Sequence, residues 1–135
     1  MRLPVLALVL GAAGFAAFGL ALLAAPDLLA LVDLAPATAT ARSDLRAVFG
    51  GLEAGFGVFL AVAARRPAWH GPALLAQCLA LGGVVVGRLA SLALDGVPRP
   101  ITFALAGLEA VGALLAGAAL VQHGAGGRAA TRSPP

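Results

Sequence analysis

The sequence predicts an all-α fold, a bundle of four transmembrane helices arranged as two helical hairpins. Hydrophobic residues make up 61% of the 135-residue chain and charged residues only 11%, whereas soluble domains have about 25% charged residues. Four apolar stretches reach the roughly 20 residues that a membrane-spanning helix needs. Prolines separate these stretches, at positions where a helix begins or has ended. The chain is therefore expected to have the lipid bilayer as its solvent.

The predicted spans follow one another closely and form one membrane domain over residues 1–121. They cover about residues 3–25, 45–64, 72–94 and 101–121. Residues 122–135 are rich in Gly, Ala, Ser and Pro, a composition that is typical of disorder. We expect these last residues to form a disordered cytoplasmic tail.

The first apolar stretch permits two interpretations. Arg2 before it and the small residues Ala24 and Ala25 at its end are also found in secretory signal peptides. Its apolar run exceeds the roughly 7–15 residues of a signal peptide, which favours a helix that stays in the membrane. Because this stretch contains no charged residue, we expect it to pack at the periphery of the bundle.

Residues 26–34 lie between the first two spans and also permit two interpretations. Asp27 follows Pro26 at one end, and Asp33 stands at the other. The segment is either a short helix in the membrane interface or a frayed continuation of the first span. The sequence does not decide between them.

The distribution of arginine predicts the orientation. All nine basic residues are arginines. Four spans place the N-terminus, the Arg65-Arg66 loop and the C-terminus on one side, and this side has five arginines and no acidic residue: Arg2, Arg65, Arg66, Arg128 and Arg132. The positive-inside rule then places both termini in the cytoplasm. Together with a composition rich in Ala, Gly, Leu and Arg, this predicts a multi-pass protein of the bacterial inner membrane.

Three ionisable residues fall within the spans: Glu53, Arg88 and Glu109. Glu53 is nine residues beyond Asp44, which places it about 13 Å below the outer face at about 1.5 Å per residue. Glu109 has the same depth and Arg88 lies about 10 Å deep by the same rise. Charged residues inside a membrane usually face the bundle interior and pair with one another. We expect a cluster of these three residues, either a structural ion-pair network or a site for protons or a ligand.

Further polar residues share helix faces with this cluster. Gln77, Arg88, Ser91 and Asp95 form one stripe on the third span, and Arg46 shares a stripe with Glu53 on the second. We expect four of the polar residues to lie near the outer interface: Asp44, Arg46, Ser91 and Asp95. The repeats Gly51-x-x-x-Gly55 and Gly83-x-x-x-Gly87 match the pattern of close helix contacts in membranes.

Several classes of site have no support in the sequence. The arginines are dispersed and form no basic face for nucleic acid. Cys78 is the single cysteine, and no Cys/His cluster has the spacing of a metal site. We expect His70 and His123 to be exposed on cytoplasmic loops, and Trp69 to be an interfacial anchor. No catalytic constellation is found, so no catalytic residue, metal or cofactor is predicted.

The combination Asp44-Leu-Arg-Ala-x-x-Gly-Gly with Gly87-Arg-x-x-Ser-x-x-x-Asp-Gly, followed by Leu108-Glu109, resembles the DUF4345 family of small bacterial membrane proteins. The likeness runs from the first span to about Val121. It implies four transmembrane helices, similar to a DoxX-type bundle, and supplies no activity. The positions typical of the family are Arg46, Gly50, Gly51, Glu53, Arg88, Asp95, Gly96 and Glu109.

Three functions remain open. The first is a structural or accessory subunit of a membrane assembly, with another membrane protein or a second copy as partner. The second is a carrier or binding protein for a small ligand or protons that uses Glu53, Arg88 and Glu109. The third is a redox accessory acting on a quinone or lipid. A closed, dry charge network would favour the first, and a crevice reaching the cluster from outside would favour the second.

Overall fold

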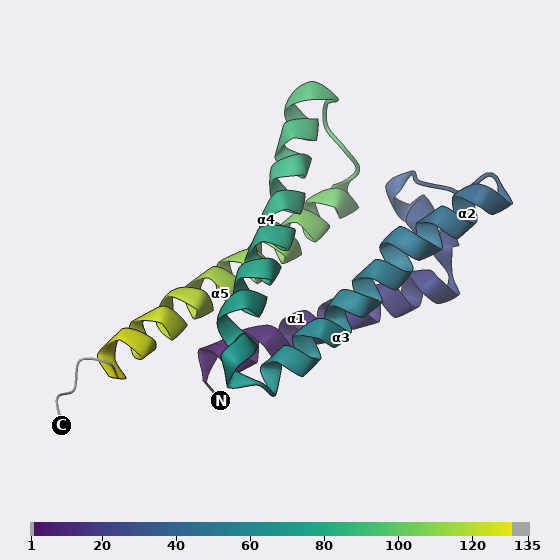
Figure 1. Cartoon of the computed structure of the whole chain (residues 1–135). Coiled ribbons are helices and arrows are strands. Elements are labelled where there is room, and N and C mark those ends of the chain that lie inside the picture. The colour runs from purple at the N-terminus through teal and green to yellow at the C-terminus, as the bar shows by residue number, and fades with distance from the viewer. Residues whose placement is uncertain (1, 131–135) are drawn as a thin grey trace.

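The computed structural model describes the backbone of residues 2–130 and the side chains of residues 2–125, and within these residues it contains helices and no strand. The long helices are α1 (Leu3–Ala24), a continuous helix made of α2 (Ala39–Leu45), η2 (Arg46–Leu52) and α3 (Glu53–Ala64), then α4 (His70–Leu94) and α5 (Pro100–Ala130) (Figure 1). Each of the four is long and apolar enough to cross a membrane. The chain is a multi-pass membrane protein, and the predicted bundle of four spans is confirmed.

Prolines mark the helix boundaries as the sequence predicts. Pro4 lies in the first turn of α1, and Pro100 begins α5. Two short 3₁₀ segments also begin with proline: η1 (Pro26–Val32) and η3 (Pro67–Trp69). A proline in the first turn removes an N–H that has no partner there, so it begins a helix without loss.

Residues 26–34 form a separate segment and do not continue the first span. Ala25 leaves the helical conformation with φ −134°, and the 3₁₀ turns of η1 follow. Asp33 ends η1 with φ 62°, a left-handed conformation that Asp tolerates better than most residues. The segment is anchored because Pro26 and Leu29 are buried.

Two helices are longer than predicted. The second begins at Ala39, where the Thr38 side chain accepts a hydrogen bond of 3.1 Å from the Ala41 N–H and caps the helix. The fifth helix, α5, continues to Ala130, so the prediction of a disordered tail is wrong for residues 122–130, and residues 131–135 lie outside the described residues. Composition misled here because the tail is also rich in Ala, which favours an existing helix.

Helices α1 and α3 are held together by glycines. A Cβ atom on Gly57 would lie 2.6 Å from the backbone nitrogen of Ala16, and one on Gly50 would lie 2.9 Å from that of Leu23. Small residues allow such close backbone approach in membranes. The predicted Gly-x-x-x-Gly contacts are wrong: a Cβ added at Gly55, Gly83 or Gly87 would meet no described atom of another helix within 4 Å, and one added at Gly51 would meet only a backbone oxygen of its own helix.

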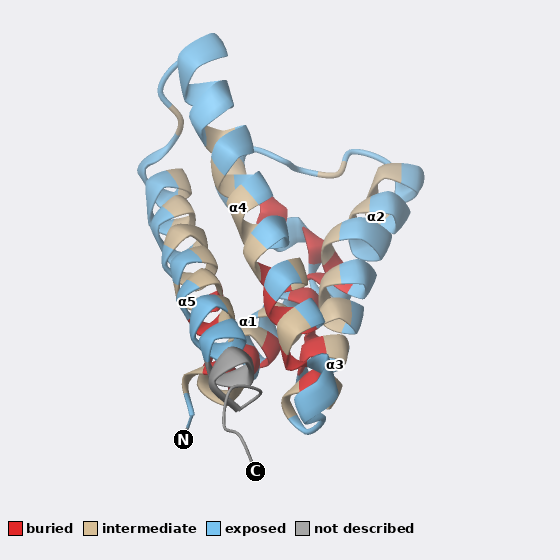
Figure 2. Ribbon diagram, turned by 60° about the vertical axis from the view of Figure 1, so that its left-hand side comes forward, coloured by how far each residue is buried: buried red, intermediate tan, exposed pale blue. Residues whose placement is uncertain are grey.

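The apolar core lies at one end of the bundle. It joins all four long helices through fully buried residues, among them Leu8 of α1, Leu60 of α3, Leu74 of α4 and Ala119 of α5. Figure 2 shows these buried segments gathered toward the end of the bundle where α1 begins and α5 ends, which we call the terminal end. The expectation that the first helix packs peripherally is wrong, because α1 contacts helices of both hairpins: α3 of its own hairpin, and α4 and α5 of the other. Its lack of charge reflects a central position.

At the opposite end, which holds Thr38 and Arg99 and which we call the loop end, the helices part. The helix pairs α1–α3 and α4–α5 each remain closely packed. Between the pairs, α4 and the α2–α3 helix meet at the terminal end and diverge toward the loop end (Figures 1 and 2). Arg88 and Glu109 lie in the loop-end half of their helices, and Glu53 lies near the middle of the α2–α3 helix.

Candidate functional site

An ion pair joins the α4–α5 hairpin in its loop-end half. Arg88 donates to both carboxylate oxygens of Glu109, from Nε over 2.6 Å and from Nη2 over 2.7 Å. Such two-point pairs fix the guanidinium plane as well as holding the charges together. The side chains are 28% and 18% exposed, so the pair is shielded but not dry. No hydrogen bond from Nη1 to a described residue is present, which leaves this group available.

Glu53 does not join the pair. It has no ion-pair partner within 4 Å among the described residues. Its position on α3 is inward, because the buried Leu60 stands seven residues further along the same face. The structure thus brings Arg88 and Glu109 into contact and leaves Glu53 as a third, separate charge beside them.

The helix ahead of Glu53 is irregular. The π-helical segment η2 ends at Leu52, directly before Glu53. A π-helical turn shifts the faces of a helix and occurs frequently at functional sites. Within η2, Gly50 packs on Leu23 of α1, and Arg46 donates from Nε to the Leu23 carbonyl over 3.0 Å. These contacts fix the start of α3 and the direction of Glu53.

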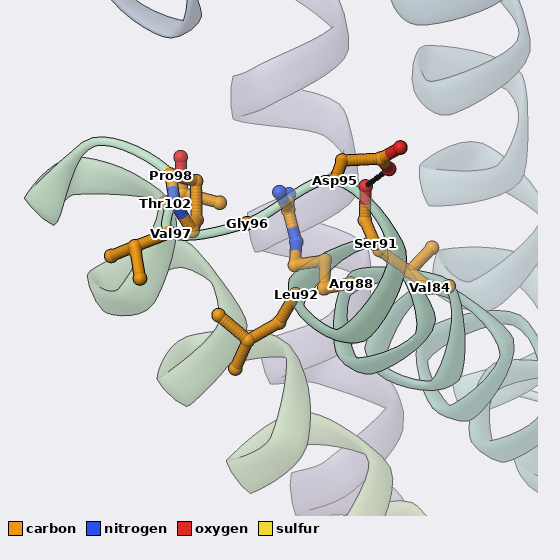
Figure 3. Close-up of a pocket in the computed structure, with 10 residues that line it drawn as sticks. Val84, Arg88, Ser91, Leu92, Asp95, Gly96, Val97, Pro98 and Thr102 are labelled. Carbon is orange, nitrogen blue, oxygen red and sulfur yellow. Dashed lines mark hydrogen bonds between the residues drawn. The ribbon is translucent and has the colours of Figure 1, made fainter.

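A hollow opens above Arg88 at the loop end. Its volume is about 470 Å³, and it is lined by the last turns of α4, the following loop and the first turn of α5. The lining residues are Val84, Gly87, Arg88, Ser91, Leu92, Asp95, Gly96, Val97, Pro98 and Thr102. Figure 3 shows the Arg88 guanidinium extending toward the loop at Gly96. The hollow therefore has a cation at its base and an apolar wall on either side.

Asp95 supplies a carboxylate at the rim of this hollow. One of its oxygens accepts a 2.6 Å hydrogen bond from the Ser91 hydroxyl, one turn earlier on α4 (Figure 3). The residue is exposed and has no ion-pair partner among the described residues. The loop then turns at Gly96 with φ 97°, a conformation that a side chain rarely adopts. The same hollow thus contains a positive and a negative group on one helix face.

Two ion pairs fasten the loop end beside the hollow. Arg99 contacts Asp33 over 2.8 Å and ties the α4–α5 loop to η1. Arg42 contacts Asp27 over 2.6 Å and ties α2 to η1. All four side chains are well exposed, so each pair adds little stability by itself. Asp44 is exposed and is not in the hollow, so one of the predicted interface residues lies apart from the site.

The polar face of α4 continues toward the terminal end with buried side chains. Gln77 is 1% exposed and donates from Nε2 to the Ala7 carbonyl of α1 over 3.4 Å, and its Oε1 lacks a partner. His70 lies seven residues earlier, is also buried, and has its Nε2 3.3 Å from the Ala64 carbonyl. Its ring packs on His123 with centroids 5.9 Å apart. The prediction that His70 is exposed is wrong.

The model of a family described as a domain of unknown function (DUF4345) matches residues 5–120. The chain belongs to the DUF4345 family. No curated protein and no solved structure matches it. The matched region of this DUF4345 member runs from the first turn of α1 to near the end of the buried part of α5, so it includes Glu53, Arg88, Glu109 and the whole hollow.

The sequence predicted part of the lining of the hollow and missed the rest. It singled out Arg88, Ser91 and Asp95, which all line the hollow. It missed Thr102 and Leu92, and neither carries a signal, because Thr and Leu are ordinary in an apolar helix. The burial of His70 had a signal: its seven-residue spacing from Gln77 places both on one face. Among the described residues no group of three His, Cys, Asp or Glu side chains could hold a metal ion.

Proposed function

We propose that this protein is a small binding protein of the bacterial inner membrane, which holds a polar ligand in the hollow above Arg88. The observation that carries the proposal is the hollow itself, about 470 Å³ in volume and open at the loop end over the Arg88–Glu109 pair. A purely structural ion pair would be better served by a closed, dry environment, since water access weakens the attraction. A crevice that reaches the charges favours binding.

The orientation proposed from the arginines predicts the side of the membrane on which the hollow opens. If the terminal end with Arg2 and Arg65 is cytoplasmic, the hollow opens to the outside of the cell. The 25 residues of α4 give a helix of about 37 Å, longer than the roughly 30 Å hydrocarbon layer. The last turns of α4 then extend beyond the hydrocarbon, and the hollow lies at the level of the lipid headgroups.

The test is to identify what is bound to the purified protein and whether it depends on the hollow. Gly87 lines the hollow, and a Cβ added there would have no described atom of another residue's side chain or of another helix within 4 Å, so Gly87→Leu is expected to narrow the hollow. Gly55→Leu is the matched control, because Gly55 is equally unobstructed on the other hairpin. Mass spectrometry of the folded proteins should find a molecule that the wild type and Gly55→Leu retain and Gly87→Leu loses. Equal retention by all three would refute the proposal.

A second function, an accessory subunit of a membrane assembly, is favoured by a different observation. Glu53, near the middle of the α2–α3 helix, faces inward without an ion-pair partner among the described residues. An intramembrane carboxylate usually finds a cation, and a partner helix with an Arg or Lys at this level would supply it. Glu53→Gln should then release the partner when the assembly is extracted in mild detergent. A wild-type protein that is extracted alone would argue against this function.

A further inference from the structure

The charges of the hollow restrict its ligand. The guanidinium of Arg88 is matched by two carboxylates, Glu109 bound to it and Asp95 at the rim, so one positive and two negative charges leave a net charge of −1. A ligand with only negative charge meets this excess and is disfavoured. A ligand with both a cation and an anion can place each group against its opposite.

Two free hydrogen-bonding groups define where such a ligand would bind. Arg88 Nη1 has no partner among the described residues, and Asp95 uses one oxygen for Ser91 and has the other free. Both residues lie on one face of α4, seven residues apart, and the guanidinium extends toward the Asp95 end of the hollow (Figure 3). An anion fits at Arg88, and a hydrogen-bonding cation fits at Asp95.

The apolar walls indicate that the ligand is a lipid and not a soluble molecule. Val84, Leu92 and Val97 line the hollow, and their side chains are 44%, 37% and 82% exposed. In a bilayer this surface faces acyl chains. The hollow is thus continuous with the region that the chains of a bound phospholipid would occupy.

We propose that the hollow binds a phospholipid with a phosphoethanolamine headgroup, with the phosphate on Arg88 and the primary ammonium on Asp95. This assignment rests on the proposed function of the hollow. A primary ammonium suits the site because the Asp95 oxygen and the Thr102 hydroxyl can accept its hydrogen bonds. A quaternary ammonium has no N–H to donate, and it is usually held by aromatic rings, none of which lines this hollow.

The experiment uses the full-length protein in nanodiscs that contain equal amounts of phosphatidylethanolamine, phosphatidylglycerol and phosphatidylcholine. Lipids that stay bound after transfer to detergent are measured by native mass spectrometry. The wild type should retain phosphatidylethanolamine above its share of the nanodisc. Asp95→Asn should reduce this enrichment about five- to tenfold, the effect of losing one charge-assisted hydrogen bond at a partly exposed site.

Asp44→Asn is the matched control, because it makes the same change at an exposed residue of the same end outside the hollow, and it should retain the lipid as the wild type does. Gly87→Leu gives a second test that leaves Asp95 in place and should also abolish the enrichment. Retention of phosphatidylglycerol or phosphatidylcholine equal to that of phosphatidylethanolamine would overturn the headgroup assignment. Release of the lipid by soluble phosphoethanolamine at equal concentration would overturn the assignment to a lipid.

Failure of this inference can be told from failure of the proposed function. If Gly87→Leu loses a different bound molecule while no lipid is enriched, the hollow is a binding site and only the headgroup assignment falls. If Gly87→Leu changes nothing that is bound to the protein, both fall together.

Discussion

The terminal half and the loop half of this bundle are built from the same small and aliphatic residues, yet only the terminal half closes around a core. Fully buried Leu8, Leu60 and Leu74 meet there, whereas in the loop half the two hairpins part (Figure 1) and the Arg88–Glu109 pair lies within the α4–α5 hairpin. Lipid is as apolar as leucine, so apolar surface alone does not bring helices together in a membrane. Close backbone contact between helices closes the terminal half. The loop half instead contains the ion pair and the open hollow.

The largest effect is expected from breaking the ion pair of the loop half. Arg88→Gln leaves Glu109 without its cation, and removing one partner of a buried pair costs about 3–5 kcal/mol in soluble proteins. The effect should be smaller here, because the pair is partly exposed and the carboxyl group can take up a proton. The double change Arg88→Gln with Glu109→Gln removes both charges and should be more stable than Arg88→Gln alone. Thermal unfolding in detergent measures both.

A double variant no more stable than the single variant would contradict this account of the pair. It would mean that Arg88 or Glu109 makes a further contact that glutamine cannot replace. The comparison also separates stability from binding, because the double variant should fold and still lose the ligand of the hollow.

The next effect concerns the glycines that join α1 to α3. A Cβ at Gly57 would lie 2.6 Å from the backbone of Ala16, whereas one at Gly55 meets no atom within 4 Å. Gly57→Ala should lower the free energy of unfolding by about 1–3 kcal/mol, as overpacking does. Gly55→Ala should leave it unchanged or raise it, because alanine favours the helix. Equal unfolding temperatures for the two variants would show that these helices are not held by close backbone contact.

The smallest effect is expected at Glu53. Because it has no ion-pair partner among the described residues, Glu53→Gln should change the free energy of unfolding by about 0.5 kcal/mol or less. Glu109→Gln should be clearly more destabilising, since it removes the partner of Arg88. Unfolding in the same detergent compares the two carboxylates directly. Equal losses for the two variants would mean that Glu53 shares the guanidinium of Arg88.

The sequence predicted the elements of this fold better than their packing. Hydropathy and prolines located four spans, because length and composition suffice for that. They could not show that the uncharged α1 is central, since lipid-facing and helix-facing residues are equally apolar. Nor could spacing distinguish Gly57, which packs on Ala16, from Gly55, which meets nothing. In the site, depth placed Arg88 near both glutamates, and only the helix directions decide that it reaches Glu109.

The central claim is that the hollow above Arg88 is open to water on the outside of the cell while the terminal half is closed. It can be tested by labelling single cysteines with a membrane-impermeant maleimide in intact cells, in a Cys78→Ala background. Ser91→Cys in the hollow should be labelled, as should Thr40→Cys, an exposed position of the loop end. Ala119→Cys in the core should not be labelled. If Thr40→Cys is labelled and Ser91→Cys is not, the hollow is not open to water. If neither variant is labelled until the cells are permeabilised, the predicted orientation is contradicted.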